Sequence, residues 1–354
     1  MERKKMKRVF LLSLALLVVF SAIVFAADSG KRVGLAEMVS LALEKNIDLK
    51  LAEISLEDAK IEYKRAQLNN LLTNSRLVEL QSELQMVQAE ENYKNTRNAV
   101  LMDIVNNYLR ISSLQQQLLT AEKEVQLEGK RIEEVAAQVK LGYKSSLELF
   151  SQESSYQSAI NGLEKLRGDL EQTIRDLRQK LALDAEVEIS ILELGKPEIW
   201  EVDEEDLSLA ASSSTLLEIR AGQVEIARSD LERARVSGTA EMEIRKKELA
   251  LERVELELAR EIHNQEMKIN NAYHQYIQAI KNMNLAEKSW IQAQEHYKII
   301  TEQNEAGYVS NNDLLSSELS LYKARDYYQS AISNYYLAMM QLQQAMGREL
   351  EVDL

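Results

Sequence analysis

Few side chains in this 354-residue sequence have the types and spacing that chemistry requires. Of the three histidines, His263 and His274 lie eleven residues apart, on one face of a helix. No carboxylate accompanies them at metal-ligand spacing, so we interpret them and His296 as solvated helix residues. Cysteine is absent, which excludes disulfides and thiolate chemistry. Because there is also no nucleophile elbow and no Gly-rich phosphate loop, we expect neither an enzyme nor a metal or cofactor site.

Two other groups of side chains are candidates for a function without covalent chemistry. Four carboxylates follow two glycines at matching positions: Glu148 and Glu153, and Asp313 and Glu318. The simplest interpretation of Glu148 and Asp313 is that of acids in the first turn of a helix, where the helix dipole favours negative charge. Four tyrosines resemble a stacking surface for ligands, but their heptad positions favour packing: Tyr327, Tyr328, Tyr335 and Tyr336.

The elements that position these residues are duplicated. Residues 141–159 recur as residues 306–324, with eight identities in nineteen positions, and the offset of 165 residues continues upstream. Both segments begin with the same glycine and tyrosine, followed by serine: Gly142, Tyr143 and Ser145, matched by Gly307, Tyr308 and Ser310. Any account of function must therefore explain two copies of one unit.

The composition and the apolar periodicity indicate long helices. The chain has 11 glycines and a single proline, Pro197, which lies in an acidic stretch between the two copies. Apolar residues seven apart form a seam from Ile104 to Val139, with a counterpart from Ile269 to Asn304. We expect in each copy a helix of about 65 residues, about 100 Å long. It should end at the Gly-Tyr pair, where glycine closes a helix and serine begins the returning one.

A shorter helix is expected before each long one, at about residues 49–68 and 217–235, with turns at 69–74 and 236–240. Neither turn has room for the roughly nine to eleven alternating residues of a membrane strand. The expected fold class is all-α, with duplicated long antiparallel helical hairpins and no membrane β-strands. Residues 184–206, in which Val187, Ile189 and Ile191 alternate like a short strand, should link the first repeat, 27–183, to the second, 207–354.

The first 26 residues read as a secretory signal peptide. A basic head is followed by an apolar run from Val9 to Phe20 and by small residues, which predicts cleavage after Ala26; an uncleaved anchor is the alternative. Cleavage leaves 38 basic and 56 acidic residues, a formal charge of −18. This charge argues against nucleic acid as a partner. We therefore expect an exported protein of the periplasm or cell envelope.

In order and spacing, these elements resemble the TolC-like outer membrane efflux protein family. The resemblance rests on the duplication and on four segments: GYKSSLELFSQE, GYVSNNDLLSSE, GLAEMVSLALEKNIDLK and YYLAMMQLQQAMG. It implies a homotrimer whose coiled-coil helices enclose a hollow α-barrel, with the glycine turns at a tapered tip. There they would meet a periplasmic adaptor (membrane fusion) protein of an efflux or type I secretion pump. The family's β-barrel strands have no counterpart, so outer-membrane association would need a partner that supplies the pore.

The resemblance also assigns roles to the tip residues. The Gly, Tyr and Ser residues of both turns would contact the adaptor, although a purely structural turn is the alternative. The four carboxylates would form rings at the narrow end that favour cations or titrate as a gate, because close like charges raise one another's pKa. An arginine of the family's gate is replaced by Val309, with Lys144 in the first copy. The competing function is a structural coiled-coil scaffold of the cell envelope without transport activity; a soluble enzyme with helical insertions has little support.

Overall fold

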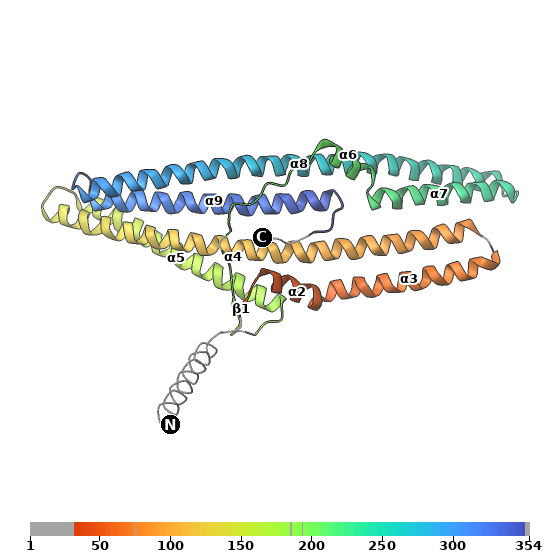
Figure 1. Ribbon diagram of the computed structural model, residues 1–354, viewed down its shortest axis with the longest axis horizontal. Helices are drawn as coiled ribbons and strands as arrows, with labels where there is room; N and C mark the ends of the chain where they lie inside the picture. Colours follow the sequence, from red (N-terminus) through yellow and green to blue (C-terminus); the bar gives the residue numbers. More distant parts are fainter. Residues whose placement is uncertain (1–31, 74, 185, 193, 351–354) are drawn as a thin grey trace, which may run out of the picture.

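The computed structural model describes residues 32–350 except 74, 185 and 193. The predicted signal peptide, residues 1–26, lies outside the described residues. The described chain is elongated, and its long helices run side by side along its length (Figure 1). Each copy consists of a short helix, a long helix and a returning helix: α3 Ile47–Thr73, α4 Arg76–Lys140 and α5 Ser146–Lys180, and then α7 Thr215–Val236, α8 Glu241–Glu305 and α9 Asn311–Ala345. None of the described helices is long and apolar enough to cross a membrane.

The two long helices, α4 and α8, each contain 65 residues, as the heptad seams predict. Near the middle of the molecule the seams are buried, with Ile104 and Ile111 inside one and Ile269 and Tyr276 inside the other. Towards the glycine turns the same seams become half-buried, as at Val139 and Asn304. The prediction of duplicated helical hairpins is therefore confirmed, with the tightest packing at mid-length.

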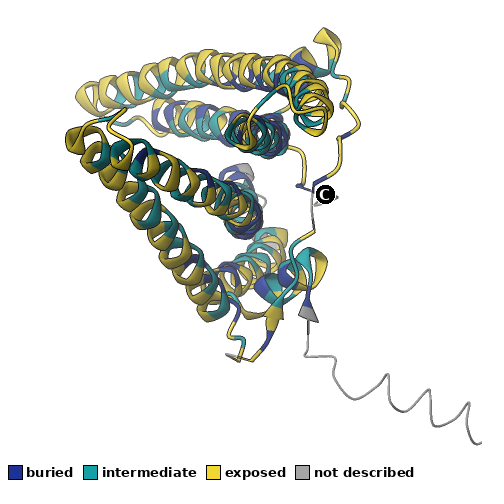
Figure 2. Cartoon of the chain, turned by 90° about the vertical axis from the view of Figure 1, so that its left-hand side faces the viewer, coloured by how far each residue is buried: buried dark blue, intermediate teal, exposed yellow. Residues whose placement is uncertain are grey.

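The helices pack in a row rather than around a common centre. On one half of the molecule α3 packs on α4, α4 on α7 and α7 on α8; on the other half α5 packs on α4, α4 on α9 and α9 on α8. Viewed with the glycine turns towards the reader, the outer sides of the hairpins are exposed, and buried residues lie where the two hairpins face each other (Figure 2). The contacts of α4 with α7 and α9 join the first copy to the second.

Two short helices and one strand pair fix the ends of the repeats. α2, Leu35–Lys45, packs on α4, and α6, Glu204–Ser212, packs on α8. β1, Arg32–Val33, pairs in parallel with β2, Glu188–Ile189, and these are the strands of the described residues. The linker thus contains a strand, as predicted, but of the three alternating apolar residues only Ile189 lies in it. α6 begins inside the segment expected to be linker.

The linker is attached to the helices by buried tyrosines. The hydroxyl of Tyr335 donates to the carbonyl of Glu198 (2.9 Å) and accepts from the backbone N–H of Trp200 (3.1 Å). The hydroxyl of Tyr276 donates to the carbonyl of Trp200 (2.7 Å). Burial is the main cause of a raised pKa at Tyr276. This cluster holds the extended chain across α8 and α9.

At the end opposite the glycine turns, both connections are short. α3 continues to Thr73 and α4 begins at Arg76, so the break expected at residues 69–74 is narrower than predicted. α7 ends at Val236 and α8 begins at Glu241, with Gly238 at φ +66° between them. The second turn therefore lies where the sequence predicts it.

Candidate functional site: the two glycine turns

The turns between α4 and α5 and between α8 and α9 lie at the same end of the molecule (Figure 1). Gly142 and Gly307 have φ of +75° and +78°, the left-handed conformation that favours glycine. The N–H of Tyr143 donates to the carbonyl of Gln138 (2.9 Å), and that of Tyr308 to the carbonyl of Gln303 (2.8 Å). Together with the glycine N–H bonds, these interactions make both helix ends Schellman motifs. The two turns have the same backbone construction.

Each returning helix begins with a capping box. The Ser145 hydroxyl accepts from the N–H of Glu148, and the Glu148 carboxylate accepts from the Ser145 N–H at 2.8 Å. Ser310 and Asp313 make the same pair of bonds, with the carboxylate 3.0 Å from the Ser310 nitrogen. Serine and the acid three residues later satisfy each other's backbone donors, which fixes the direction of the returning helix.

The capping bonds control the charge of the two acids. Hydrogen bonds from the backbone and then the hydroxyl of Ser145 lower the pKa of Glu148. The hydroxyl and then the backbone of Ser310 lower the pKa of Asp313. Both carboxylates are on the surface and carry a negative charge at neutral pH. Within the chain they are therefore structural acids of the first helical turn.

The other two predicted carboxylates lie farther along the returning helices. Glu153 is exposed on α5. Glu318 is only 20% exposed and forms an ion pair with Lys123 of α4 (2.6 Å). The hydrogen bond to Glu318 raises the pKa of Lys123. The structure therefore places Glu318 between the two copies, in contact with a lysine that the sequence did not identify.

Further polar contacts join the copies near this ion pair. Lys323 of α9 pairs with Glu124 of α4 (3.1 Å), and the Thr120 hydroxyl of α4 donates to the Asp326 carboxylate of α9. Burial raises the pKa of Asp326. These contacts cross between α4 and α9, which are separated by about 200 residues of sequence. The constant offset of 165 residues between the copies does not predict these contacts between α4 and α9.

The turns themselves present aromatic and apolar side chains to solvent. Tyr143 is 80% exposed and Tyr308 is 83% exposed, and Leu141 and Leu147 are also exposed. In the second turn, the side-chain amide of Asn304 donates to the carbonyl of Val309 (3.1 Å). A rigid backbone with exposed tyrosines is suited to docking another protein, since tyrosine contributes contact area with few rotatable bonds.

The remaining candidate residues are the three histidines and the four tyrosines, which lie on α8 and α9. His263, His274 and His296 are exposed on α8. Among the described residues no group of three or more His, Cys, Asp or Glu side chains could hold a metal ion. Of the four tyrosines, Tyr328 and Tyr335 are buried and Tyr336 is half-buried, whereas Tyr327 is 51% exposed. Packing, the interpretation favoured by their heptad positions, holds for three of them.

The two hairpins together define the fold. A duplicated pair of long helical hairpins, joined side by side with both glycine turns at one end, is the arrangement that the family resemblance predicts. The resemblance inferred from the sequence is confirmed for the fold, including its all-α character.

Comparison with solved structures supports this assignment. The chain is similar to the outer membrane protein VceC from Vibrio cholerae, with 14% identity, a TM-score of 0.61, and coverage of 90% of this chain and 97% of that one. It is similar to the CmeC outer membrane channel of Campylobacter jejuni, with 13% identity, a TM-score of 0.63, and coverage of 90% and 87%. For the outer-membrane channel OprN the identity is 11%, the TM-score 0.66, and the coverage 88% and 89%. No protein-family model matches the chain, and no curated protein matches its sequence.

Proposed function

We propose that this chain is an exported component of an efflux or secretion channel, a helical conduit in the cell envelope that passes its cargo without covalent chemistry. The observation that carries the proposal is the shared fold, which extends over about 90% of the chain and of channels such as CmeC. The work of such a protein is to enclose a path, which needs helices and not a catalytic site. The proposed assembly is a homotrimer, because a row of helices with two open edges encloses a space only with further copies.

The proposed partner is the helical hairpin of a periplasmic adaptor protein. Supporting this are the two glycine turns, which have the same Schellman and capping construction and expose Tyr143 and Tyr308. A hairpin could lie between adjacent turns and contact both tyrosines. In the assembly, Glu148 and Asp313 would add negative charge around the same end, which favours cations.

The test uses glycines of equal backbone conformation at opposite ends of the molecule. Gly307→Leu forces a branched side chain into the left-handed region at the tip, where φ is +78°. Gly238→Leu imposes the same strain on the α7–α8 turn, where φ is +66° and a Cβ also meets nothing within 4 Å. Binding of an adaptor hairpin encoded in the same genome is measured by calorimetry. We expect Gly307→Leu to lower the affinity for the adaptor hairpin at least tenfold and Gly238→Leu to leave this affinity unchanged.

Two results would contradict the proposal. One is adaptor binding that is indifferent to Gly307→Leu while the α-helical content is retained. The other is a mature protein that stays monomeric with unchanged helicity, since a single row of helices encloses no path.

A further inference from the structure

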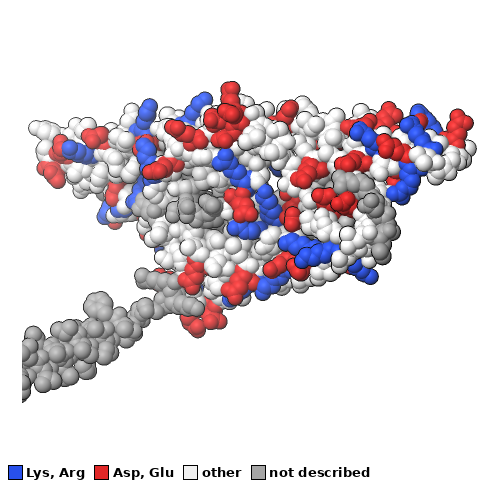
Figure 3. All heavy atoms as spheres, turned by 45° about the vertical axis from the view of Figure 1, so that its right-hand side comes forward, with Lys and Arg blue, Asp and Glu red and all other residues white. Residues whose placement is uncertain are grey.

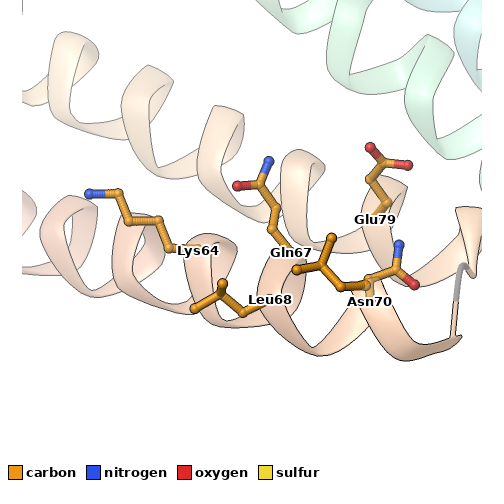
Figure 4. A pocket seen from close by; sticks show the side chains of 6 residues that line it. Lys64, Gln67, Leu68, Asn70 and Glu79 are labelled. Carbon is orange, nitrogen blue, oxygen red and sulfur yellow. The ribbon is translucent and has the colours of Figure 1, made fainter.

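The two copies contact each other through different side chains at the two ends of the molecule. At the end opposite the glycine turns α4 packs on α7, and a Cβ on Gly222 would lie 3.4 Å from Cδ1 of Leu84, an apolar side chain. The charged residues Lys64 and Glu79 line a hollow there, but it lies between α3 and α4, which belong to one copy (Figure 4). On the half that carries the glycine turns, α4 packs on α9, and polar side chains join the copies.

Four polar contacts connect α4 to α9 between mid-length and the glycine turns. They are the Thr120–Asp326 hydrogen bond, the ion pairs Lys323–Glu124 and Lys123–Glu318, and a hydrogen bond from the Arg131 guanidinium to the Ser316 hydroxyl (3.4 Å). Three of these contacts contain a cation. The fourth brings a carboxylate, that of Asp326, against an uncharged hydroxyl.

The carboxylate of Asp326 is only partly accessible to water. Asp326 is half-buried, and the side chains beside it are buried, since Thr120 is 7% exposed and Gln329, one turn along α9, is 6% exposed. An ionised carboxylate out of water is costly unless a cation or several donors compensate it. Burial raises the pKa of Asp326 more than the Thr120 hydroxyl lowers it. The contact therefore favours the protonated form of Asp326 more than water does.

The charged groups on the surrounding elements have other partners or face solvent. Arg325 precedes Asp326 in the sequence and lowers its pKa, but by less than burial raises it. The others are paired among themselves or exposed: Lys123 with Glu318, Lys323 with Glu124, Glu287 of α8 with Lys196 of the linker, and Lys288 of α8 exposed to solvent. None of these lysines pairs with Asp326.

The two copies differ at this position. With the offset of 165 residues, the equivalent of Asp326 is Asn161 of α5, and the equivalent of Thr120 is Leu285 of α8. Asn161 is exposed. A charge at this position is thus not needed for the helical fold, and it occurs in α9, the returning helix that contacts the other copy.

We infer that Asp326 makes the contact between the two copies depend on pH: the charged carboxylate weakens the attachment of α9 to α4, and protonation strengthens it. The inference goes beyond the proposed function, because it concerns contacts within one chain and holds whether or not copies assemble. The half with the glycine turns is the part affected, since the buried residues at mid-length, such as Ile111 and Ile332, do not titrate.

The direction of the effect follows from the raised folded pKa of Asp326. The contribution of Asp326 to the contact is fully present below the ordinary aspartate pKa of about 3.9 and is lost as the pH rises through the folded pKa. The two ion pairs between α4 and α9 change in the opposite direction, because a protonated glutamate no longer attracts a lysine. A comparison of the natural chain with an Asp326 variant separates the two effects.

Distances between spin labels test the inference, because the natural chain has no cysteine that would also be labelled. The labels are attached to Lys140→Cys and Glu305→Cys, exposed and equivalent residues at the ends of α4 and α8. Labelled protein is mixed with an excess of unlabelled protein, so that only distances within one chain are measured.

The comparison is between this labelled chain and the same chain with Asp326→Asn, which keeps the shape of the side chain and removes its charge. At neutral pH the distances should be shorter and less spread with Asp326→Asn, and the difference should vanish as the pH falls to about 4. Equal distances in the two chains at neutral pH, or a difference that does not change with pH, would overturn the inference.

Two further variants keep the test decisive, and circular dichroism checks that each retains its helices. Asn161→Asp adds a carboxylate at the equivalent exposed position and should leave the distances unchanged at every pH. With Thr120→Val in both chains, the hydroxyl donor that favours charged Asp326 is removed, so the difference should vanish at a pH roughly 0.5–1 unit higher. An unchanged pH with Thr120→Val, or an equally large effect of Asn161→Asp, would show that the contact does not depend on the charge of Asp326.

Discussion

At the scale of single residues, the Schellman motif recurs at the ends of α4, α5, α8 and α9, and only the end of α5 has alanine in place of the glycine. α9 ends with Gly347 at φ +71°, whereas the equivalent position at the end of α5 holds Ala182 at φ +48°. Both positions make the same Schellman bonds, including the N–H of Leu183 to the carbonyl of Arg178 (2.9 Å). A non-glycine residue in this region is strained by its Cβ. The neighbouring carbonyl of Leu181 also accepts from Lys45 (3.3 Å), which helps to hold the turn.

Replacing this alanine should stabilise the protein. We expect Ala182→Gly to increase the free energy of unfolding by about 0.5–1 kcal/mol, because relief of left-handed strain exceeds the added flexibility of the unfolded chain. Gly347→Ala, at the equivalent position of the second copy, should have the opposite sign. Chemical unfolding followed by circular dichroism measures both. Equal effects of the two substitutions would contradict the strain argument.

The capping acids should make the tip sensitive to acid. Their folded pKa values lie below the ordinary ones, so the stability they contribute is fully present at neutral pH and is lost as the pH falls through the folded pKa. Asp313→Asn keeps the shape of the side chain and removes its charge. The difference in thermal midpoint between this variant and the natural chain should be largest near pH 7 and should vanish well below the ordinary aspartate pKa of about 3.9. A difference that does not change with pH would show that the charge of Asp313 is not what stabilises the turn.

At the scale of elements, the helices and most of the turns between them could be predicted, whereas the contacts between distant helices could not. The length of α4 and α8 could be predicted because apolar residues recur every seven positions along both and the single proline lies outside them. Glycine followed by serine and an acid gave the position and the construction of both turns. These are local signals, since each depends on residues within about one or two helical turns.

Most of the parts that were missed depend on contacts between distant residues. The Lys123–Glu318 pair spans 195 residues, and Lys323–Glu124 spans 199. Neither heptads nor capping rules include such pairs, so Glu318 was expected as a rim carboxylate of the tip. The break after α3 was predicted too wide because its Asn-rich residues resemble a turn, yet they continue the helix. Pairing of β1 with β2 likewise joins segments far apart in the sequence.

Charges along the helices show the same mixture of local and distant pairing. Acidic and basic side chains lie interspersed over the face shown in Figure 3. Arg228–Glu255 and Arg235–Glu248 connect α7 to α8, whereas Lys246–Glu243 lies within α8. Exposed pairs of this kind contribute little stability each, so they select the alignment of the helices more than they hold them together.

The hydrogen bonds between the buried Tyr335 hydroxyl and the linker should contribute measurably to the free energy of unfolding. Tyr335→Phe leaves the carbonyl of Glu198 and the N–H of Trp200 without the hydroxyl as partner. We expect a loss of about 1–3 kcal/mol in the free energy of unfolding. Tyr327→Phe, on the same helix but 51% exposed, should change it by less than about 0.5 kcal/mol. Denaturant titration measures both, and equal effects would show that the hydroxyl bonds do not anchor the linker.

At the scale of the whole molecule, the protomer is a curved wall with two open edges and one specialised end. The buried residues lie between its hairpins (Figure 2). Several apolar side chains of α3 are exposed, among them Ile47, Ile54 and Leu68. The proposed assembly would complete this wall, since the apolar side chains exposed at its edges mark surfaces that another helix can cover. Assembly would cover them and place the glycine turns together at one end.

The central claim is that the assembled protein encloses a path. Electron microscopy of the mature protein in solution tests it most directly. We expect end views of a three-fold ring with an open centre, and side views about as long as a helix of 65 residues, roughly 100 Å. A solid rod with no central opening would contradict the account and would favour a structural scaffold of the cell envelope.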